Sequence, residues 1–180
     1  PWVSPASPVG AMGADAGRAR VAQSFDCVGR WDWLVNRVGM GSRGSVFSSG
    51  QSDWQRVMRI NVETMFLASK FAIPAMIASS EGGGEAGAIV NISSISAIRP
   101  RGLPAYSTSK GAVIALTRAM AVDHGPDGIR VNCVAPGPVH TPMVHAGGMS
   151  DAAREQRRNA SALKIEGNGW DVGMTVRYLL

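Results

Sequence analysis

Three short apolar runs divide the chain, and none of them alternates between apolar and polar positions. They occupy residues 33–38, 88–93 and 129–134, and Gly, Pro or polar residues bound each of them. A short continuous apolar run is typical of a strand that is buried on both faces, as in a parallel sheet. We therefore predict three parallel strands in the middle of a layered domain.

Segments with apolar residues at helical spacing lie between and after these runs. Helices are predicted at 52–80, 104–124, 150–160 and 170–180. The order strand, helix, strand, helix, strand predicts an α/β fold, in which helices cover both faces of a parallel sheet.

Residues at the ends of the two longest helices support these boundaries. Ser52 and Gln55 fit a capping box at the start of the first helix, and Pro74 is expected to kink that helix near its end. Pro104 suits the first turn of the second helix, and Gly125-Pro126 should end it.

The segments outside these elements are richer in small and polar residues. Residues 1–20 show little apolar periodicity, so we predict an irregular leader at 1–20 and one domain over 21–180. A short helix is expected at 20–28. Three consecutive glycines at 82–84 indicate a surface loop.

The composition is that of a globular chain, with 180 residues, 45% of them hydrophobic and 17% charged. No continuous apolar run approaches the ~18 residues of a membrane span and no signal-peptide pattern is found, so we expect neither a membrane-spanning segment nor secretion.

Cys27 and Cys133 make no disulfide framework, which favours the cytoplasm. The net charge is +5, but no basic stripe carries interleaved aromatics, so no nucleic-acid partner is expected. His140 and His145 lack the spacing of metal ligands, and no metal site is expected.

Tyr106 and Lys110 stand four residues apart, which places both on one face of the predicted helix 104–124. An ammonium near a phenol stabilises the phenolate, and such a tyrosine can give and take a proton near neutral pH. The spacing alone is weak support, because a surface tyrosine beside a solvated lysine has the same spacing.

Polar residues follow two of the predicted strands. Asn91-Ile92-Ser93-Ser94 ends one strand, and Pro136-Gly137-Pro138-Val139-His140-Thr141 follows the next. The carboxyl ends of parallel strands are where open α/β sheets bind ligands. The sequence therefore predicts one crevice shared by these segments and the start of the Tyr106 helix.

Five segments, in this order and spacing, resemble the short-chain dehydrogenase/reductase family over about residues 29–180. They are Asp32 through Gly39, Trp54 through Asn61, Ile89 through Ser94, Tyr106-Ser107-Thr108-Ser109-Lys110-Gly111, and Ile129 through Thr141. The resemblance implies a partial Rossmann-like doubly wound parallel sheet. The family's first βαβ units and its last strand would lie outside this chain.

The resemblance also implies a role for each matching residue. Tyr106 would exchange a proton with the substrate oxygen, and Lys110 would tune Tyr106 and bind the nicotinamide ribose. Ser94 would hold the substrate oxygen, with Ser93 as the alternative because the loop to Tyr106 is one residue shorter than usual. Asn61 would anchor a water of the proton relay, or else it is a helix-interior asparagine bonded to a backbone carbonyl. The implied cofactor contacts are Asn36, Gly39, Tyr106, Lys110, Pro136, Gly137, Val139 (through its backbone) and Thr141.

The chain also departs from the family's pattern. The Gly-rich turn Thr-Gly-x-x-x-Gly-x-Gly, which receives the pyrophosphate, has no counterpart here. Gly39, Gly41 and Gly44 spell G-x-G-x-x-G, but no helix is predicted directly after them, so no helix N-terminus would meet a phosphate. Arg37 and Val38 replace small or neutral residues of the family.

The function implied is hydride transfer between NAD or NADP and a secondary alcohol or carbonyl, a small-molecule substrate. The alternative is an inactive fragment that keeps the family's oligomer interface, formed by helices 52–80 and 104–124. A homo-oligomer, dimer or tetramer, is implied for the complete protein. Residues 144–160 correspond to the family's substrate lid. We predict that Arg154, Arg157 and Arg158 are a solvated helix face there, and contact with an anionic substrate is the other possibility.

Overall fold

The computed structural model describes residues 31–80 and 87–180 of the chain. The predicted leader at 1–20, the short helix at 20–28, Cys27 and the glycines at 82–84 lie outside these residues. Within them the fold is α/β with a parallel sheet, as predicted.

The sheet contains β1 (Trp33–Asn36), β2 (Gly87–Ile92) and β3 (Ile129–Val134), in the order β1-β2-β3 and all parallel. Asn36 pairs with Asn91, and Asn91 pairs with Cys133. The central strand β2 is buried through Ala88–Asn91, which explains its unbroken apolar run. The carboxyl ends of all three strands therefore lie at one edge.

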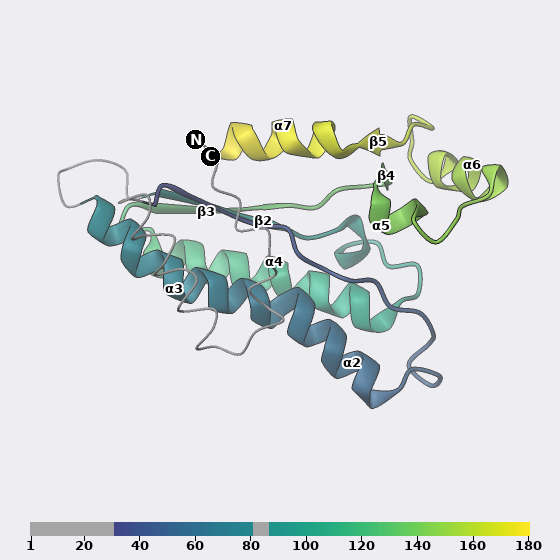
Figure 1. The fold of residues 1–180 in the computed structure, drawn as a ribbon, viewed down its shortest axis with the longest axis horizontal. Helices are drawn as coiled ribbons and strands as arrows, with labels where there is room; N and C mark the ends of the chain where they lie inside the picture. The colour runs from purple at the N-terminus through teal and green to yellow at the C-terminus, as the bar shows by residue number, and fades with distance from the viewer. Residues whose placement is uncertain (1–30, 81–86) are drawn as a thin grey trace.

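Helices cover both faces of this sheet (Figure 1). One face carries α3 (Thr64–Ser79) and α4 (Pro104–His124), and the other carries α7 (Gly169–Leu179). The hydrophobic core lies between the sheet and the first pair of helices, and it comprises Ile73, Met76, Ile89, Met120, Ile129 and Val131. Each buried aliphatic or Met side chain contributes roughly 1.5–3 kcal/mol to folding, so this layer holds the scaffold together.

The long helix predicted at 52–80 is one continuous rod with an irregular turn inside it. It consists of α2 (Gln51–Met58), a π-helical turn η2 (Arg59–Glu63) and α3. The predicted capping box is wrong, because the N-cap is Gly50 and Ser52 makes no capping hydrogen bond. The helix continues past the exposed Pro74 to Ser79.

This rod, Gln51–Ser79, is long and apolar enough to cross a membrane by length and composition alone, which the sequence analysis did not anticipate. In the fold, however, seven residues of α3 are buried, and the helix packs on β1 and β2. That is the packing of a core helix.

The remaining elements gather at the carboxyl edge of the sheet (Figure 1). They are η3 (Ile95–Ala97), β4 (Val139–His140), α5 (Pro142–His145), α6 (Asp151–Asn159) and β5 (Gly167–Asn168). The strands β4 and β5 pair in parallel as a separate two-stranded sheet.

The helices predicted at 150–160 and 170–180 are confirmed to within a residue or two. Gly125 ends α4 as predicted, and its backbone keeps a right-handed helical conformation.

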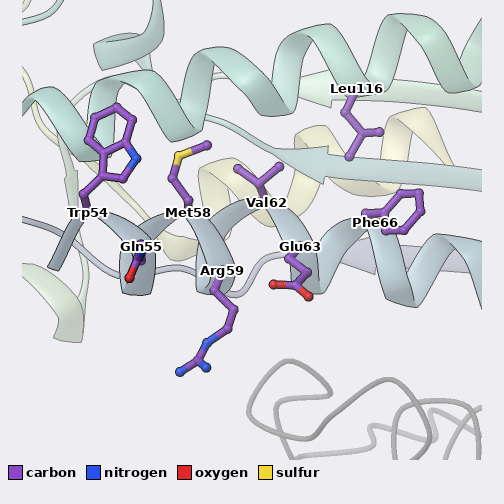
Figure 2. A pocket seen from close by; sticks show the side chains of 8 residues that line it. All are labelled: Trp54, Gln55, Met58, Arg59, Val62, Glu63, Phe66 and Leu116. Atoms are coloured by element: carbon purple, nitrogen blue, oxygen red, sulfur yellow. The ribbon is translucent and has the colours of Figure 1, made fainter. Parts of the chain in front are cut away.

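A shallow groove runs between the rod and α4. Its lining comprises Trp54, Gln55, Met58, Arg59, Val62, Glu63, Phe66 and Leu116. Figure 2 shows Met58 and Val62 pointing toward α4, whereas Arg59 points away from it. None of the predicted site residues lines this groove.

A chain of buried side-chain hydrogen bonds joins the layers. Asn36 Nδ2 donates to Asn91 Oδ1 at 2.8 Å, and Asn91 Nδ2 donates to Thr117 Oγ1 on α4 at 3.0 Å. Asn36 Nδ2 also donates to Ser69 Oγ on α3 at 3.2 Å. The four residues are 0–7% exposed. Buried amides that satisfy one another in this way fix the register of β1 on β2 and the seating of both helices.

We expect Asn91→Ala to destabilise the fold by about 1–3 kcal/mol, because it removes two buried hydrogen bonds, one accepted from the Asn36 amide and one donated to the Thr117 hydroxyl. The matched control is Asn159→Ala at the exposed end of α6, with an expected effect below ~0.5 kcal/mol. Urea unfolding followed by circular dichroism measures both. Equal effects for the two variants would contradict the role assigned to this network.

Candidate active site

The predicted site residues converge where β2 and β3 end and α4 begins. Ser93 and Ser94 directly follow β2, and Tyr106 lies in the first turn of α4, half-buried. Lys110 follows one turn later on the same face, as the spacing predicted. The loop after β1 completes the arrangement from the third side.

Lys110 is the most constrained of these side chains, with only 4% of it exposed. Its Nζ donates to the backbone carbonyl oxygen of Ile92 at 2.9 Å and lies 5.9 Å from the centroid of the Tyr106 ring. A Cβ added to Gly39, in the loop after β1, would lie 3.2 Å from the same Nζ, so a side chain there would crowd the ammonium and require it to shift by a few tenths of an ångström. The ammonium is thus enclosed by β2, α4 and the β1 loop.

This burial lowers the pKa of Lys110 to about 8, because an ammonium loses solvation in the interior. The nearby Cys133 acts in the opposite direction, raising the pKa. Burial raises the pKa of the Cys133 thiol above its usual value, which makes this cysteine a poor nucleophile.

Asn61 sits in the π-helical turn and is fully buried. Its Oδ1 accepts from the Met40 amide at 2.7 Å, and its Nδ2 donates to the Met40 carbonyl at 3.0 Å and to Ser109 Oγ at 2.9 Å. Both of its amide hydrogens are therefore used. The alternative of an asparagine bonded to a backbone carbonyl is confirmed, with the carbonyl on another segment; a role in holding a water stays a prediction.

Ser109 extends this contact to the first turn of α4, since its hydroxyl donates to the Tyr106 carbonyl at 2.7 Å. The Tyr106 amide in turn donates to Ser42 Oγ at 3.2 Å. Because the N-cap Leu103 offers no side-chain bond, Ser42 caps α4 from the β1 loop. Ser42 and Ser109 are not among the site residues predicted from the sequence, because their contacts join residues far apart in the chain.

The two serines after β2 differ in what their hydroxyls do. Ser93 Oγ donates to the Lys110 carbonyl at 2.7 Å and so fixes α4 to the end of the strand. Ser94 Oγ accepts from the Ser96 amide at 3.1 Å, which leaves its own hydrogen without a hydrogen-bond acceptor among the described residues. Ser94, rather than Ser93, therefore has a donor to offer a ligand.

The other predicted cofactor contacts fall into two groups. Asn36 uses both amide hydrogens within the buried network, and Gly39 faces Lys110 and Asn61. Residues 136–141 follow β3 along the same edge, where Val139 enters β4 and Thr141 is the N-cap of α5. The Gly39-Gly41-Gly44 pattern is followed by a loop and turn rather than by a helix, as expected.

The arginine face predicted to be solvated is only partly so. Arg154 and Arg157 both pair with Glu166, whose side chain is 2% exposed, although the Arg154 side chain itself is 49% exposed. Arg158, 51% exposed, pairs with Glu155. His140 and His145 stack at 4.5 Å between ring centroids. No group of three His, Cys, Asp or Glu residues that could hold a metal ion occurs within 31–80 and 87–180.

A family model described as "Enoyl-(Acyl carrier protein) reductase" matches residues 8–180 of the chain. The chain belongs to the short-chain dehydrogenase/reductase family. Meso-2,3-butanediol dehydrogenase of Serratia marcescens is 40% identical over 119 residues, 66% of this chain and 45% of the relative. The chain is also 40% identical to the "Inactive 2-(S)-hydroxypropyl-CoM dehydrogenase 2" of Xanthobacter autotrophicus over 124 residues, which cover 67% of this chain and 51% of that one.

Solved structures of short-chain dehydrogenases/reductases share the fold. The ligand-free aldohexose dehydrogenase of Thermoplasma acidophilum superposes with a TM-score of 0.83 at 32% identity, covering 95% of this chain and 68% of the other. The chain spans about half the length of the curated relatives it matches.

The pKa of Lys110 leads to a pH prediction. Between about pH 8 and 10.5 the unfolded chain keeps a proton on Lys110 that the folded chain has released, so folding stability should rise with pH in this window. Below pH 8 both states hold the proton and this contribution to the slope vanishes. Denaturant unfolding from pH 7 to 10 should show the rise in the wild type relative to Lys110→Met. Parallel curves for the two proteins would refute the burial of the ammonium.

Proposed function

We propose that the protein containing this chain is an oxidoreductase that interconverts a secondary alcohol and a carbonyl with NAD or NADP in the cytoplasm. The observation that carries this proposal is the buried Lys110 ammonium, held by the Ile92 carbonyl one turn from Tyr106. The cofactor, when bound, supplies or accepts the hydride. The protein has to bind and orient the substrate and the cofactor, and to move one proton.

Tyr106 is the group proposed to move that proton. When an alcohol is oxidised, the phenolate oxygen accepts the hydroxyl proton; in the reverse direction the phenol returns it to the forming alkoxide. Lys110 is largely protonated at neutral pH, with a pKa of about 8, and its charge stabilises the phenolate. The Ser94 hydroxyl hydrogen would donate to the same substrate oxygen and orient it.

The residues present fit the nicotinamide half of the cofactor. Lys110 would bind the ribose, and the Val139 backbone with the Thr141 hydroxyl would hold the carboxamide. The half-buried segment 136–141 offers backbone and hydroxyl groups at the strand ends, where α/β sheets bind ligands. No pyrophosphate turn lies within the described residues.

Removal of the phenol oxygen should abolish turnover and leave cofactor binding intact. In the full-length enzyme, Tyr106→Phe should lower kcat by about 10²–10⁴-fold, the usual range for a positioned acid or base. Tyr178→Phe on the exposed face of α7 is the matched control, because Tyr178 is the only other tyrosine and is 87% exposed. Absorbance of the reduced nicotinamide measures turnover, and fluorescence titration measures cofactor affinity. Persistent turnover in Tyr106→Phe would sink the assignment.

A second candidate is that the chain alone is catalytically inactive and serves only to associate with a second copy. The apolar groove between the rod and α4 supports association, because Phe66 is 47% exposed there. Arg59 and Glu63 also border the groove. A two-fold axis would pair Arg59 of one copy with Glu63 of the other, and the reverse. An inactive relative at 40% identity shows that family membership is compatible with lost activity. Micromolar binding of NADH by the 180-residue chain would overturn this candidate.

The groove yields a prediction on assembly under either candidate. The chain has a mass of 18.9 kDa and should sediment as a dimer of twice that mass. Phe66→Ser should raise the dissociation constant of the dimer at least tenfold, because it removes an exposed ring from the groove. Phe47→Ser is the control, since Phe47 is 99% exposed in a loop outside the groove. Sedimentation equilibrium measures both. A monomeric wild type, or equal effects of the two variants, would contradict the interface.

A further inference from the structure

A buried carboxylate fastens helix α6 to the rest of the protein. Glu166 Oε1 accepts from Arg157 Nε at 2.7 Å, and Arg154 Nε lies 3.5 Å from Oε2. Only 2% of the Glu166 side chain is exposed, and Oε2 has no hydrogen-bond partner. The Arg157 hydrogen bond is the main reason why the pKa of Glu166 lies below its usual value. The Arg154 and Arg157 side chains are 49% and 33% exposed, so this carboxylate lies near the surface, and the two arginines supply its contacts there.

The same guanidinium reaches a second element. Arg157 Nη2 donates to the Val139 carbonyl oxygen in β4 at 3.1 Å. Val139 also pairs with Gly167, whose amide donates to the Pro138 carbonyl at 2.9 Å. Arg157 therefore joins α6, β4 and the residue before β5 through one planar group.

This arrangement has a consequence for the backbone of Val139. If α6 moved away from β4, the Val139 carbonyl would lose its bond to Arg157, and the Glu166 carboxylate would lose its contacts with Arg157 and Arg154, which both lie on α6. The two Arg157 bonds are lost together, because both come from one guanidinium. The segment from Val139 to Thr141 is thus tied to the position of α6.

We propose that Arg157 is a positioning residue, which uses Glu166 as its anchor and Val139 as its target to hold the backbone of 139–141 in place for the nicotinamide carboxamide. This inference rests on the proposed function. In this role the Arg157 guanidinium binds the Glu166 carboxylate and the Val139 carbonyl instead of an anionic substrate. The planar fork explains why arginine is needed, because one lysine ammonium cannot serve both acceptors with the same geometry.

The first experiment needs no cofactor and uses the 180-residue chain. Hydrogen exchange should show the Gly167 amide and the amides of α6 exchanging at least tenfold faster in Arg157→Met than in the wild type. Arg158→Met is the matched control, since Arg158 makes only an exposed contact of 3.8 Å with Glu155 on the same helix. Amides within α4 report that each variant is folded. Equal exchange in Arg157→Met and Arg158→Met would overturn the proposal.

The second experiment separates positioning from mere stability in the full-length enzyme. Arg157→Met should raise the KM for the cofactor about tenfold with a smaller change in kcat, Arg157→Lys should fall between, and Arg158→Met should match the wild type. Faster exchange without any rise in KM would also overturn the positioning role. A wild type that neither binds cofactor nor turns over would instead refute the proposed function, and the exchange result would still show whether Arg157 fastens α6.

Discussion

The structure depends on how one buried ammonium is satisfied. Lys110 lies in the interior with its Nζ bonded to the carbonyl of the last residue of β2, and an unpaired charge at that depth would be strongly destabilising. That single hydrogen bond requires α4 to cross the end of β2 at a fixed height. It thereby places Tyr106, one turn earlier, at the carboxyl edge of the sheet. Glycine at position 39 suits the same constraint, because a side chain there would crowd the ammonium.

Around this lysine, buried or partly buried polar side chains hydrogen-bond the helices to the loop after β1. Asn61 joins the rod to the β1 loop through Met40, and Ser109 and Ser42 bond the backbone of Tyr106 on either side. The π-helical turn brings Asn61 to this position in the middle of the rod, and such turns are frequent at functional sites. The start of α4 is thus held through the backbone of Tyr106.

Much of this fold was predictable, because its strongest determinants are local. The three strands followed from unbroken apolar runs, and α4 followed from Pro104 at its start and Gly125-Pro126 at its end. Tyr106 and Lys110 share a face because they are four residues apart. The Ser42 cap and the Glu166–Arg157 pair were not predictable in the same way, since each joins segments that only the tertiary fold brings together. The capping box at Ser52 failed because the helix begins one residue earlier, with Gly50 at the cap.

The most direct test of this account is a pH titration of Lys110 itself by NMR of its ε-carbon. The chain has only three lysines, Lys70, Lys110 and Lys164, so Lys110→Met identifies the signal at once. The account predicts a titration midpoint of about 8 for Lys110 in the folded chain. A midpoint at 10.5, the value of a lysine in water, would contradict it, because the ammonium would then be solvated rather than enclosed between β2, α4 and Gly39.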